Sequence, residues 1–381
     1  MDISSTQSSS APSSSGAPSG AASSGKAPVA ARTYQPDLLT KLTALSGRGL
    51  LALPPALLSA LGSLTNRDGN RLDSDVRASL KLLDVVSGDD IVDLPLDKAR
   101  AQVDREAHLA AGTMQAVGGV TEHDVAGVRV RHYRPRGFES AGTDLPTLVY
   151  LHGGGWVTGS LNSHESTARW LCSRADVAVL AVDYRLAPEH PFPAGLDDVT
   201  AVVSAAMAGE VAGVDGSRVA VGGDSAGGNL SAAVCLRLRD EGKPQPRLQM
   251  LFVPNVNLKE YTTASFTEFA DGYYLTRGQM DWYRDHYIPN EDDRSNPWAS
   301  PILAEDLSGL APAYVAVAGF DVLRDEGEVY AQRLKDAGVA TTLRRHEGLV
   351  HPFVNSTGLW RGARRALDEA AGALRLALDV V

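Results

Sequence analysis

Short apolar segments typical of buried β-strands alternate with helical segments after about residue 118. The predicted strands cover residues 128–133, 147–151, 177–182, 219–221, 250–253, 314–318 and 341–345. The predicted helices between them cover residues 166–174, 196–207, 230–240 and 326–337. Nearly continuous apolar strands that alternate with helices form a mostly parallel sheet covered by helices on both faces. The sequence therefore predicts an α/β fold, in which ligands bind at the carboxyl ends of the strands.

The N-terminal part of the chain has a different composition. Residues 1–30 contain 23 Ser, Ala, Pro and Gly residues and no basic residue before Lys26, so we expect a disordered tail and not a secretory signal peptide. Residues 31–117 place apolar side chains at helical spacing, and we expect a helical region there. No stretch reaches the roughly 18 uninterrupted apolar residues of a membrane span. We therefore expect a cytoplasmic protein with no integral membrane span.

Charge and cysteine content argue against several other classes. Among the 381 residues, 46 Asp and Glu outnumber 36 Lys and Arg, and the formal charge is −10. Such a surface is unsuited to nucleic acid, whose phosphates require a basic face. Two cysteines, Cys172 and Cys235, cannot form a disulfide scaffold, so we expect reduced thiols. No Cys and His residues have the spacing of a zinc site, and we expect no metal.

The segment after the predicted strand 219–221 is a candidate nucleophile turn. Gly223, Ser225 and Gly227 fit the pattern G-x-S-x-G, and no other position in the chain does. In this pattern a serine occupies a strained turn between a strand and a helix, and the small residues on either side prevent collisions. The helix that follows directs the positive end of its dipole at Ser225, which favours developing negative charge. A glycine-rich turn with a capping serine is the alternative.

Three consecutive glycines follow His152, directly after the predicted strand 147–151. Their backbone can direct N–H groups outward, where they would hold the oxyanion of a tetrahedral intermediate together with the residue after the nucleophile. We predict Gly154, Gly155 and Ala226 as the donors, with Gly153 as the alternative, and we expect His152 to orient this loop. A phosphate-binding loop is disfavoured, because no Lys-Ser/Thr pair follows.

A candidate acid and a candidate base follow the last two predicted strands. Strand-to-helix nucleophile turns of this type are followed in the chain by an acid and then by a histidine. Asp321 directly follows the first of these strands, whereas Asp325 and Glu326 suit the first turn of the next helix. Of two histidines after the last strand, His346 continues the strand and His351 lies in the loop beyond it. We therefore predict His351 as the base.

An aromatic-rich segment, residues 257–301, interrupts the alternation of strands and helices. A structureless loop of that length is uncommon inside a compact domain. We expect helical segments that form part of a lid together with the N-terminal helical region. We also expect Trp156, Tyr273 and Tyr274 to line an apolar pocket, with ordinary core packing as the alternative for each.

Together these motifs resemble the hormone-sensitive-lipase-like group of α/β-hydrolases, the bacterial family IV carboxylesterases. The resemblance rests on residues 152–156, 183–194, 223–227, 321–325 and 351–353, whose order and spacing agree with the family from about residue 130 to 355. It implies an α/β-hydrolase catalytic domain over residues 118–381. It also implies a helical cap built from residues 31–117 and an insertion at about 257–301.

The resemblance further implies roles for single residues. Ser225 would be the nucleophile, Asp321 the acid and His351 the base, while the glycines after His152 and the N–H of Ala226 would form the oxyanion hole. Residues 183–194 would brace the loops of the site.

Two departures from the family pattern affect these expectations. Pro352 follows the candidate base, where the family commonly has glycine, and proline fixes φ and lacks an N–H. The histidine-glycine motif also lies some seventy residues later than is common in the family. Apart from the tail, the additional residues are 31–70, which we expect to extend the cap; contact with a lipid surface or a second subunit is the alternative.

The resemblance implies a serine carboxylesterase that hydrolyses short- to medium-chain esters through an acyl-enzyme, without a metal or organic cofactor. A small-molecule ester would be its partner, and a homodimer is frequent in the family. One alternative is a non-catalytic ligand-binding protein of the same fold, which the presence of all three triad residue types disfavours. The other alternative is an amidase or long-chain lipase that uses the same triad.

Overall fold

The computed structural model of the chain describes residues 29–31, 49, 53–58, 60, 62–86, 89–139 and 142–380. Most of the segment predicted to be a disordered tail, residues 1–28, lies outside the described residues. None of the described helices is long and apolar enough to cross a membrane.

The described strands form a single sheet in the order β1-β2-β3-β5-β4-β6-β7-β8-β9. Their bounds are Val29–Ala30 (β1), Gly119–Val125 (β2), Val128–Arg134 (β3), Leu145–Leu151 (β4), Ala178–Val182 (β5), Val214–Asp224 (β6), Gln249–Phe252 (β7), Ala313–Phe320 (β8) and Thr341–Val350 (β9). Pairing is antiparallel from β1 through β2 and β3 to β5, and parallel from β5 through β4 to β9. The mostly parallel sheet predicted from the sequence is therefore confirmed.

Two elements at the antiparallel edge were not predicted. β2 pairs along its whole length with β3. β1 pairs with Thr121 and Glu122 of β2 and consists of Val29 and Ala30, the last two residues of the predicted tail. The tail prediction is wrong for these two residues, because their backbone extends the sheet.

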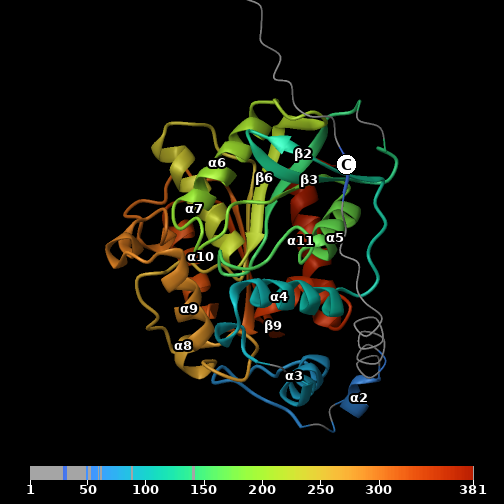
Figure 1. Ribbon diagram of the computed structural model, residues 1–381, viewed down its shortest axis with the longest axis vertical. Helices are drawn as coiled ribbons and strands as arrows, with labels where there is room; N and C mark the ends of the chain where they lie inside the picture. The colour runs from blue at the N-terminus through green and yellow to red at the C-terminus, as the bar shows by residue number, and fades with distance from the viewer. Residues whose placement is uncertain are drawn as a thin grey trace, which may run out of the picture.

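The strands at the centre of the sheet form the core of the protein. Every residue of β4, β5 and β8 is buried. Burial on both faces explains why their sequences read as continuous apolar runs, because helices cover both sides of a parallel sheet. Two helices, α5 (Glu165–Ala175) and α11 (Arg361–Ala377), pack together on one face. The other face is covered by α6 (Ala194–Met207), α7 (Ala226–Asp240) and α10 (Arg324–Asp336) (Figure 1).

Most of the remaining described helices gather at the end of the sheet toward which β6 points (Figure 1), whereas η4 (Pro301–Leu303) contacts α7 and α10. Those from the N-terminal part are α2 (Pro55–Leu58), α3 (Ser74–Val86), η2 (Ile91–Asp93) and α4 (Leu96–Ala111). Those from the aromatic-rich segment are α8 (Ala264–Glu268), α9 (Arg277–Tyr287) and η3 (Glu291–Ser295). Both groups lie at the carboxyl ends of the parallel strands, which is where a ligand would bind in this fold.

Candidate active site

Ser225 lies in a tight turn between β6 and α7. Its backbone has φ 55° and ψ −115°, a conformation that non-glycine residues rarely adopt. A Cβ on Gly223 or on Gly227 would collide with the carbonyl oxygen of Leu151 in β4. The neighbouring backbone therefore leaves no room for a side chain at either glycine of the motif. The turn holds a half-buried Ser225 at the end of the strand.

The strained turn is fixed by the adjacent strand. The Ser225 N–H donates to the carbonyl oxygen of Phe252 at the end of β7, at 2.8 Å. The Phe252 ring in turn lies 6.3 Å from the ring of Phe353, two residues after His351. Phe252 therefore contacts both the turn that carries Ser225 and the loop that carries His351.

His351 and Asp321 form a hydrogen-bonded pair at the ends of β9 and β8. The His351 Nδ1 lies 2.8 Å from Asp321 Oδ2, while Asp321 Oδ1 accepts from the N–H of Leu323 at 3.1 Å. Asp321 is 2 % exposed, and a buried carboxylate accepts a hydrogen bond, so the proton of the neutral imidazole lies on Nδ1. This tautomer leaves Nε2 available as a base. His346 lies inside β9 and its ring packs edge-on against Phe353.

The order of the strands brings the three predicted residues to one edge of the sheet. β6, β7, β8 and β9 are consecutive parallel neighbours. Ser225, Asp321 and His351 follow the carboxyl ends of β6, β8 and β9 respectively. The strand order in the sheet, rather than proximity in the sequence, brings these three positions to the same edge.

The glycine loop directs one of its N–H groups inward. The Gly153 N–H points at Asp224 Oδ1 and at His164 Nε2, each at 3.2 Å. Among the described residues, the N–H groups of Gly154, Gly155 and Ala226 donate no hydrogen bond. Since the N–H of Gly153 is occupied, these three groups are the candidates for holding an oxyanion.

Asp224, the residue before Ser225, is the centre of a buried network that the sequence did not reveal. The Tyr150 hydroxyl donates to Asp224 Oδ1 at 2.6 Å, and His164 Nε2 lies 3.1 Å from Oδ2. His164 Nε2 also lies 2.9 Å from the side-chain amide of Asn355. Burial opposes ionisation of Asp224, but His164 and Tyr150 outweigh it and lower the pKa of this carboxyl. One charged group thus connects the serine turn with the glycine loop and with η5 (His351–Asn355).

His152 orients the glycine loop, as expected. Its Nδ1 lies 2.8 Å from the carbonyl oxygen of Gly153, and its ring stacks on Tyr184 at 4.4 Å. Burial and the nearby His164 lower the pKa of His152 to about 4, so the ring is neutral at neutral pH. The Tyr184 hydroxyl donates to the His152 carbonyl, and the Ala187 N–H donates to that of Trp156. Residues 183–194 therefore brace the loop, as the family resemblance implied.

The aromatic residues expected to line a pocket have different surroundings. Trp156 is 1 % exposed and stacks on Tyr287 of α9, so its ring packs in the core instead of facing an open surface. Tyr273 is half-buried and packs against Phe320, the residue before Asp321. Tyr274 is 37 % exposed, and its hydroxyl donates to Glu106 of α4. Tyr274 thereby connects the aromatic-rich segment to the N-terminal helices.

The sequence did not single out Tyr283 of α9, although it packs against the glycine loop. A Cβ on Gly155 would collide with the Tyr283 ring, and the Tyr283 hydroxyl lies 3.3 Å from Thr158 Oγ1. Only the aromatic richness of residues 257–301 hinted at such a contact. Within the described ranges, no cluster of three His, Cys, Asp or Glu side chains could hold a metal ion. Cys172 and Cys235 are free and buried.

Comparison with known proteins places this site in a family. A family model described as the alpha/beta hydrolase fold matches residues 148–355. The chain is 43 % identical over 326 residues to carboxylic ester hydrolase LipN of Mycobacterium tuberculosis, a match that covers 82 % of this chain and 85 % of that protein. The chain belongs to the α/β-hydrolase family. Its predicted resemblance to the hormone-sensitive-lipase-like group is thereby confirmed.

Other members of this α/β-hydrolase family are similar over most of the chain. Ethyl acetate hydrolase of Pseudomonas putida is 35 % identical over 289 residues, which cover 74 % of this chain and 90 % of that protein. Among solved structures, an ester hydrolase from the metagenome of Lake Arreo, complexed with a derivative of bipyridine phosphonate, matches with a TM-score of 0.77. It is 40 % identical, and the match covers 81 % of this chain and all of that one.

Proposed function

We propose that this α/β-hydrolase is a serine carboxylesterase that hydrolyses short- to medium-chain esters with Ser225, His351 and Asp321 as its triad. The observation that carries the proposal is the 2.8 Å contact between His351 and Asp321, at the sheet edge where Ser225 occupies a strained turn. The contact supports the proposal because a base needs a second group to orient it before it can activate a serine.

The enzyme class follows from the family. Relatives at 43 %, 42 % and 40 % identity are named as a carboxylic ester hydrolase, a carboxylesterase and an esterase. The chain is accordingly a carboxylic ester hydrolase. A preference for small esters is the finer part of the proposal, and the name of the relative that hydrolyses ethyl acetate supports it.

In the proposed acylation step, His351 Nε2 takes the proton of the Ser225 hydroxyl as its oxygen attacks the ester carbonyl carbon. The carbonyl oxygen becomes an oxyanion that accepts hydrogen bonds from the N–H groups of Gly154, Gly155 and Ala226. Asp321 stabilises the imidazolium that forms. His351 then donates its proton to the alkoxide oxygen, the C–O bond breaks, and the alcohol leaves an acyl-serine.

In the proposed deacylation step, water replaces the alcohol. His351 removes a proton from the water as its oxygen attacks the acyl carbon, and it returns that proton to Ser225 as the carboxylic acid departs. Protons and oxygen atoms balance with the ester and one water as the reactants. The α7 N-terminus, directed at Ser225, favours the negative charge that develops in both steps.

The proposed acyl and alcohol sites lie under the helices at the carboxyl end of the sheet, which we propose act as a cap. The Tyr283 ring packs against Gly155, and the Tyr273 ring packs against Phe320, the residue before Asp321. Aromatic walls of this kind favour apolar acyl groups. A homodimer and a cytoplasmic location are further parts of the proposal; they come from the family resemblance and the sequence.

Two measurements test this proposal. Intact-mass and peptide analysis after treatment with a fluorophosphonate should find one adduct, on Ser225. A series of 4-nitrophenyl esters should give its highest kcat/KM at short or medium acyl chains. A protein that binds esters but gives no adduct would be a ligand-binding relative, and a maximum at long chains with activation at an oil–water interface would identify a lipase.

A further inference from the structure

The loop that carries Asp321 is held from outside the sheet on both sides of the carboxylate. Two residues before Asp321, the carbonyl oxygen of Gly319 accepts from the Asn66 side-chain amide at 3.0 Å. One residue after it, the carbonyl oxygen of Val322 accepts from the Ser265 hydroxyl at 2.7 Å. Asn66 belongs to the N-terminal region that the family pattern leaves unexplained, and Ser265 belongs to α8.

The Gly319 carbonyl is available because the strand pairing is irregular at that point. In the β8–β9 ladder, Ala318 pairs with His346 and Phe320 pairs with Val350, so Gly319 has no partner residue in β9. Its carbonyl oxygen instead accepts from Asn66 and, at 3.1 Å, from the guanidinium of Arg324. The position of Asp321 therefore depends on side chains as well as on the sheet.

Asn66 is fixed before it reaches Gly319. It lies in a short hairpin closed by the bridge between Thr65 and Arg71. The Asn66 side-chain oxygen accepts from the N–H groups of Asp68 and Asn70, at 3.1 and 2.9 Å. With its oxygen held by its own turn, the amide nitrogen can only point toward Gly319. Asn66 is 7 % exposed, so this hydrogen bond forms largely away from water.

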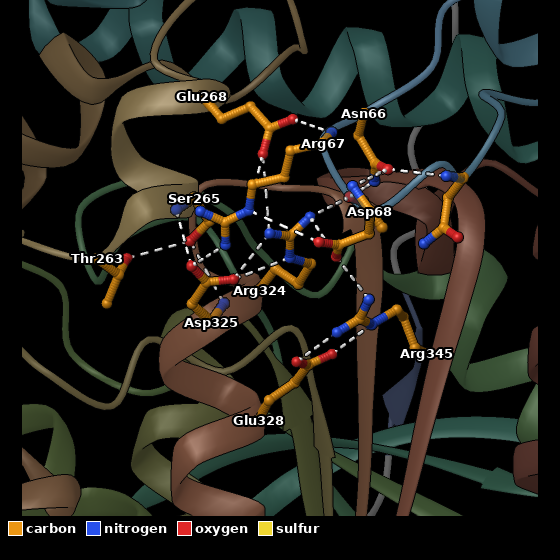
Figure 2. A network of polar contacts seen from close by, with 12 residues as sticks. Asn66, Arg67, Asp68, Thr263, Ser265, Glu268, Arg324, Asp325, Glu328 and Arg345 are labelled. Atoms are coloured by element: carbon orange, nitrogen blue, oxygen red, sulfur yellow. Dashed lines mark hydrogen bonds and ion pairs between the residues drawn. The ribbon is translucent and has the colours of Figure 1, made fainter.

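A charged cluster joins the same hairpin to the acid loop (Figure 2). Its centre is Arg324, a fully buried guanidinium that pairs with Asp68 of the hairpin, Glu268 of α8 and Asp325 of α10. Burial opposes ionisation of Asp325, but hydrogen bonds from Ser265 and Arg324 outweigh it and lower the pKa of this carboxyl. Arg67 adds a second bridge, from Asp325 to Glu268.

The buried amide, rather than the ion pair of Arg67, is the decisive contact. The Arg67 side chain is 42 % exposed, and exposed ion pairs contribute little. Asn66 is shielded and its partner lies two residues from Asp321. A displacement at Gly319 therefore passes along two peptide units to the carboxylate that orients His351.

We propose that Asn66 is a positioning residue for Asp321, and that the N-terminal hairpin, residues 64–72, thereby contributes to catalysis. The inference rests on the proposed triad. Misplacing a group by about 1 Å can cost roughly 100-fold in rate. Loss of the Asn66 contact should therefore lower kcat more than it raises KM.

Two substitutions and one control test this proposal. Asn66→Asp keeps an oxygen for the hairpin but cannot donate to Gly319, and Asn66→Ala removes both contacts. Gln332→Glu makes the same change from amide to carboxylate at an exposed position of α10, outside the proposed cap, where the amide donates to Asp336. Thermal unfolding of each variant measures how much folded enzyme is present in the assays.

For Asn66→Asp we expect kcat to fall about 10-fold or more, with KM within about twofold of the Gln332→Glu control. A merely structural role would lower the amount of folded enzyme without changing kcat per folded molecule.

The low-field proton resonance of the His351–Asp321 hydrogen bond gives a readout that does not depend on turnover. We expect it to shift or broaden in both Asn66 variants. Wild-type rates and an unchanged resonance in the folded Asn66 variants would overturn the inference. That outcome differs from failure of the proposed triad, in which Ser225→Ala would stay active.

Discussion

Asp224→Ala removes the carboxylate that joins the serine turn to the glycine loop. The Tyr150 hydroxyl would lose its partner. His164 Nε2 and the Gly153 N–H would each lose one contact and keep another, because His164 also contacts Asn355 and Gly153 also contacts His164. A buried polar group left unpaired costs about 1–3 kcal/mol. One unpaired hydroxyl, together with two lost contacts of about 1 kcal/mol each, predicts a loss of about 3–5 kcal/mol in the free energy of unfolding. That loss is a large part of the roughly 5–15 kcal/mol that stabilises a typical domain.

Asp224→Asn is the matched control, because it keeps the size of the side chain and an oxygen for Tyr150. We expect its free energy of unfolding to fall by about 1–2 kcal/mol, because an uncharged hydrogen bond is weaker than one to a carboxylate. Urea unfolding followed by tryptophan fluorescence measures both values, and kcat measured on the folded fraction reports the glycine loop. We expect kcat to fall about 100-fold in Asp224→Ala, since the oxyanion donors lose their alignment. Equal unfolding free energies for the two variants, or an Ala variant within about 1 kcal/mol of wild type, would refute this reasoning.

Three further predictions concern the base, the glycine loop and the edge of the sheet. Asp321→Asn should lower kcat about 10⁴-fold with little change in KM, because the imidazole loses its tautomer; an effect on KM alone would contradict this role. Gly155→Ala should lower kcat/KM sharply, because the added Cβ collides with the Tyr283 ring. Adding Tyr283→Ala should restore part of kcat/KM, and losses of the two single variants that simply add in the double variant would contradict this packing. Burial lowers the pKa of His132 from 6.5 to about 3. As the pH falls below about 6.5, His132 therefore takes up a proton in the unfolded chain but stays neutral in the folded chain. The free energy of unfolding should fall by about 2 kcal/mol between pH 7 and 5 from this group alone. In urea unfolding, His132→Gln should remove that part of the pH dependence, and a pH dependence equal to that of the wild type would contradict the prediction.

The central strands could be predicted because the fold buries both of their faces. β4, β5 and β8 contain continuous apolar runs that only a covered sheet explains. β2 was missed because it lies near the antiparallel edge, where its polar residues remain half-buried and interrupt any apolar run. α11 was missed for a different reason. Its buried face is largely alanine, which gives a weak apolar signal, although the helix covers one face of the sheet.

The triad candidates could be predicted because each follows a strand directly. Ser225, Asp321 and His351 each come directly after a parallel strand, so they lie at the same edge of the sheet whatever the distance between them in the sequence. The sequence favoured Gly154 and Gly155 as donors and left Gly153 open as the alternative. The choice between them depends on Asp224 and His164, which lie 71 and 11 residues from Gly153 in the chain.

The contacts around the proposed triad could not be predicted from the sequence. Asn66 and Gly319 are 253 residues apart, and no local pattern links a hairpin in the N-terminal region to the loop after β8. Tyr283 and Gly155 meet only because α9 folds back over the end of the sheet. Sequence reveals residues that chemistry requires at set spacings, whereas their supports depend on tertiary packing.

The most direct measurement of the central claim is the turnover of Ser225→Ala on a short-chain 4-nitrophenyl ester, compared with the wild-type enzyme at equal folded concentration. We expect a loss of about 10⁶-fold, to the level of the serine-independent background. A variant that retained more than a few per cent of wild-type turnover would show that the hydroxyl at the end of β6 is not the nucleophile.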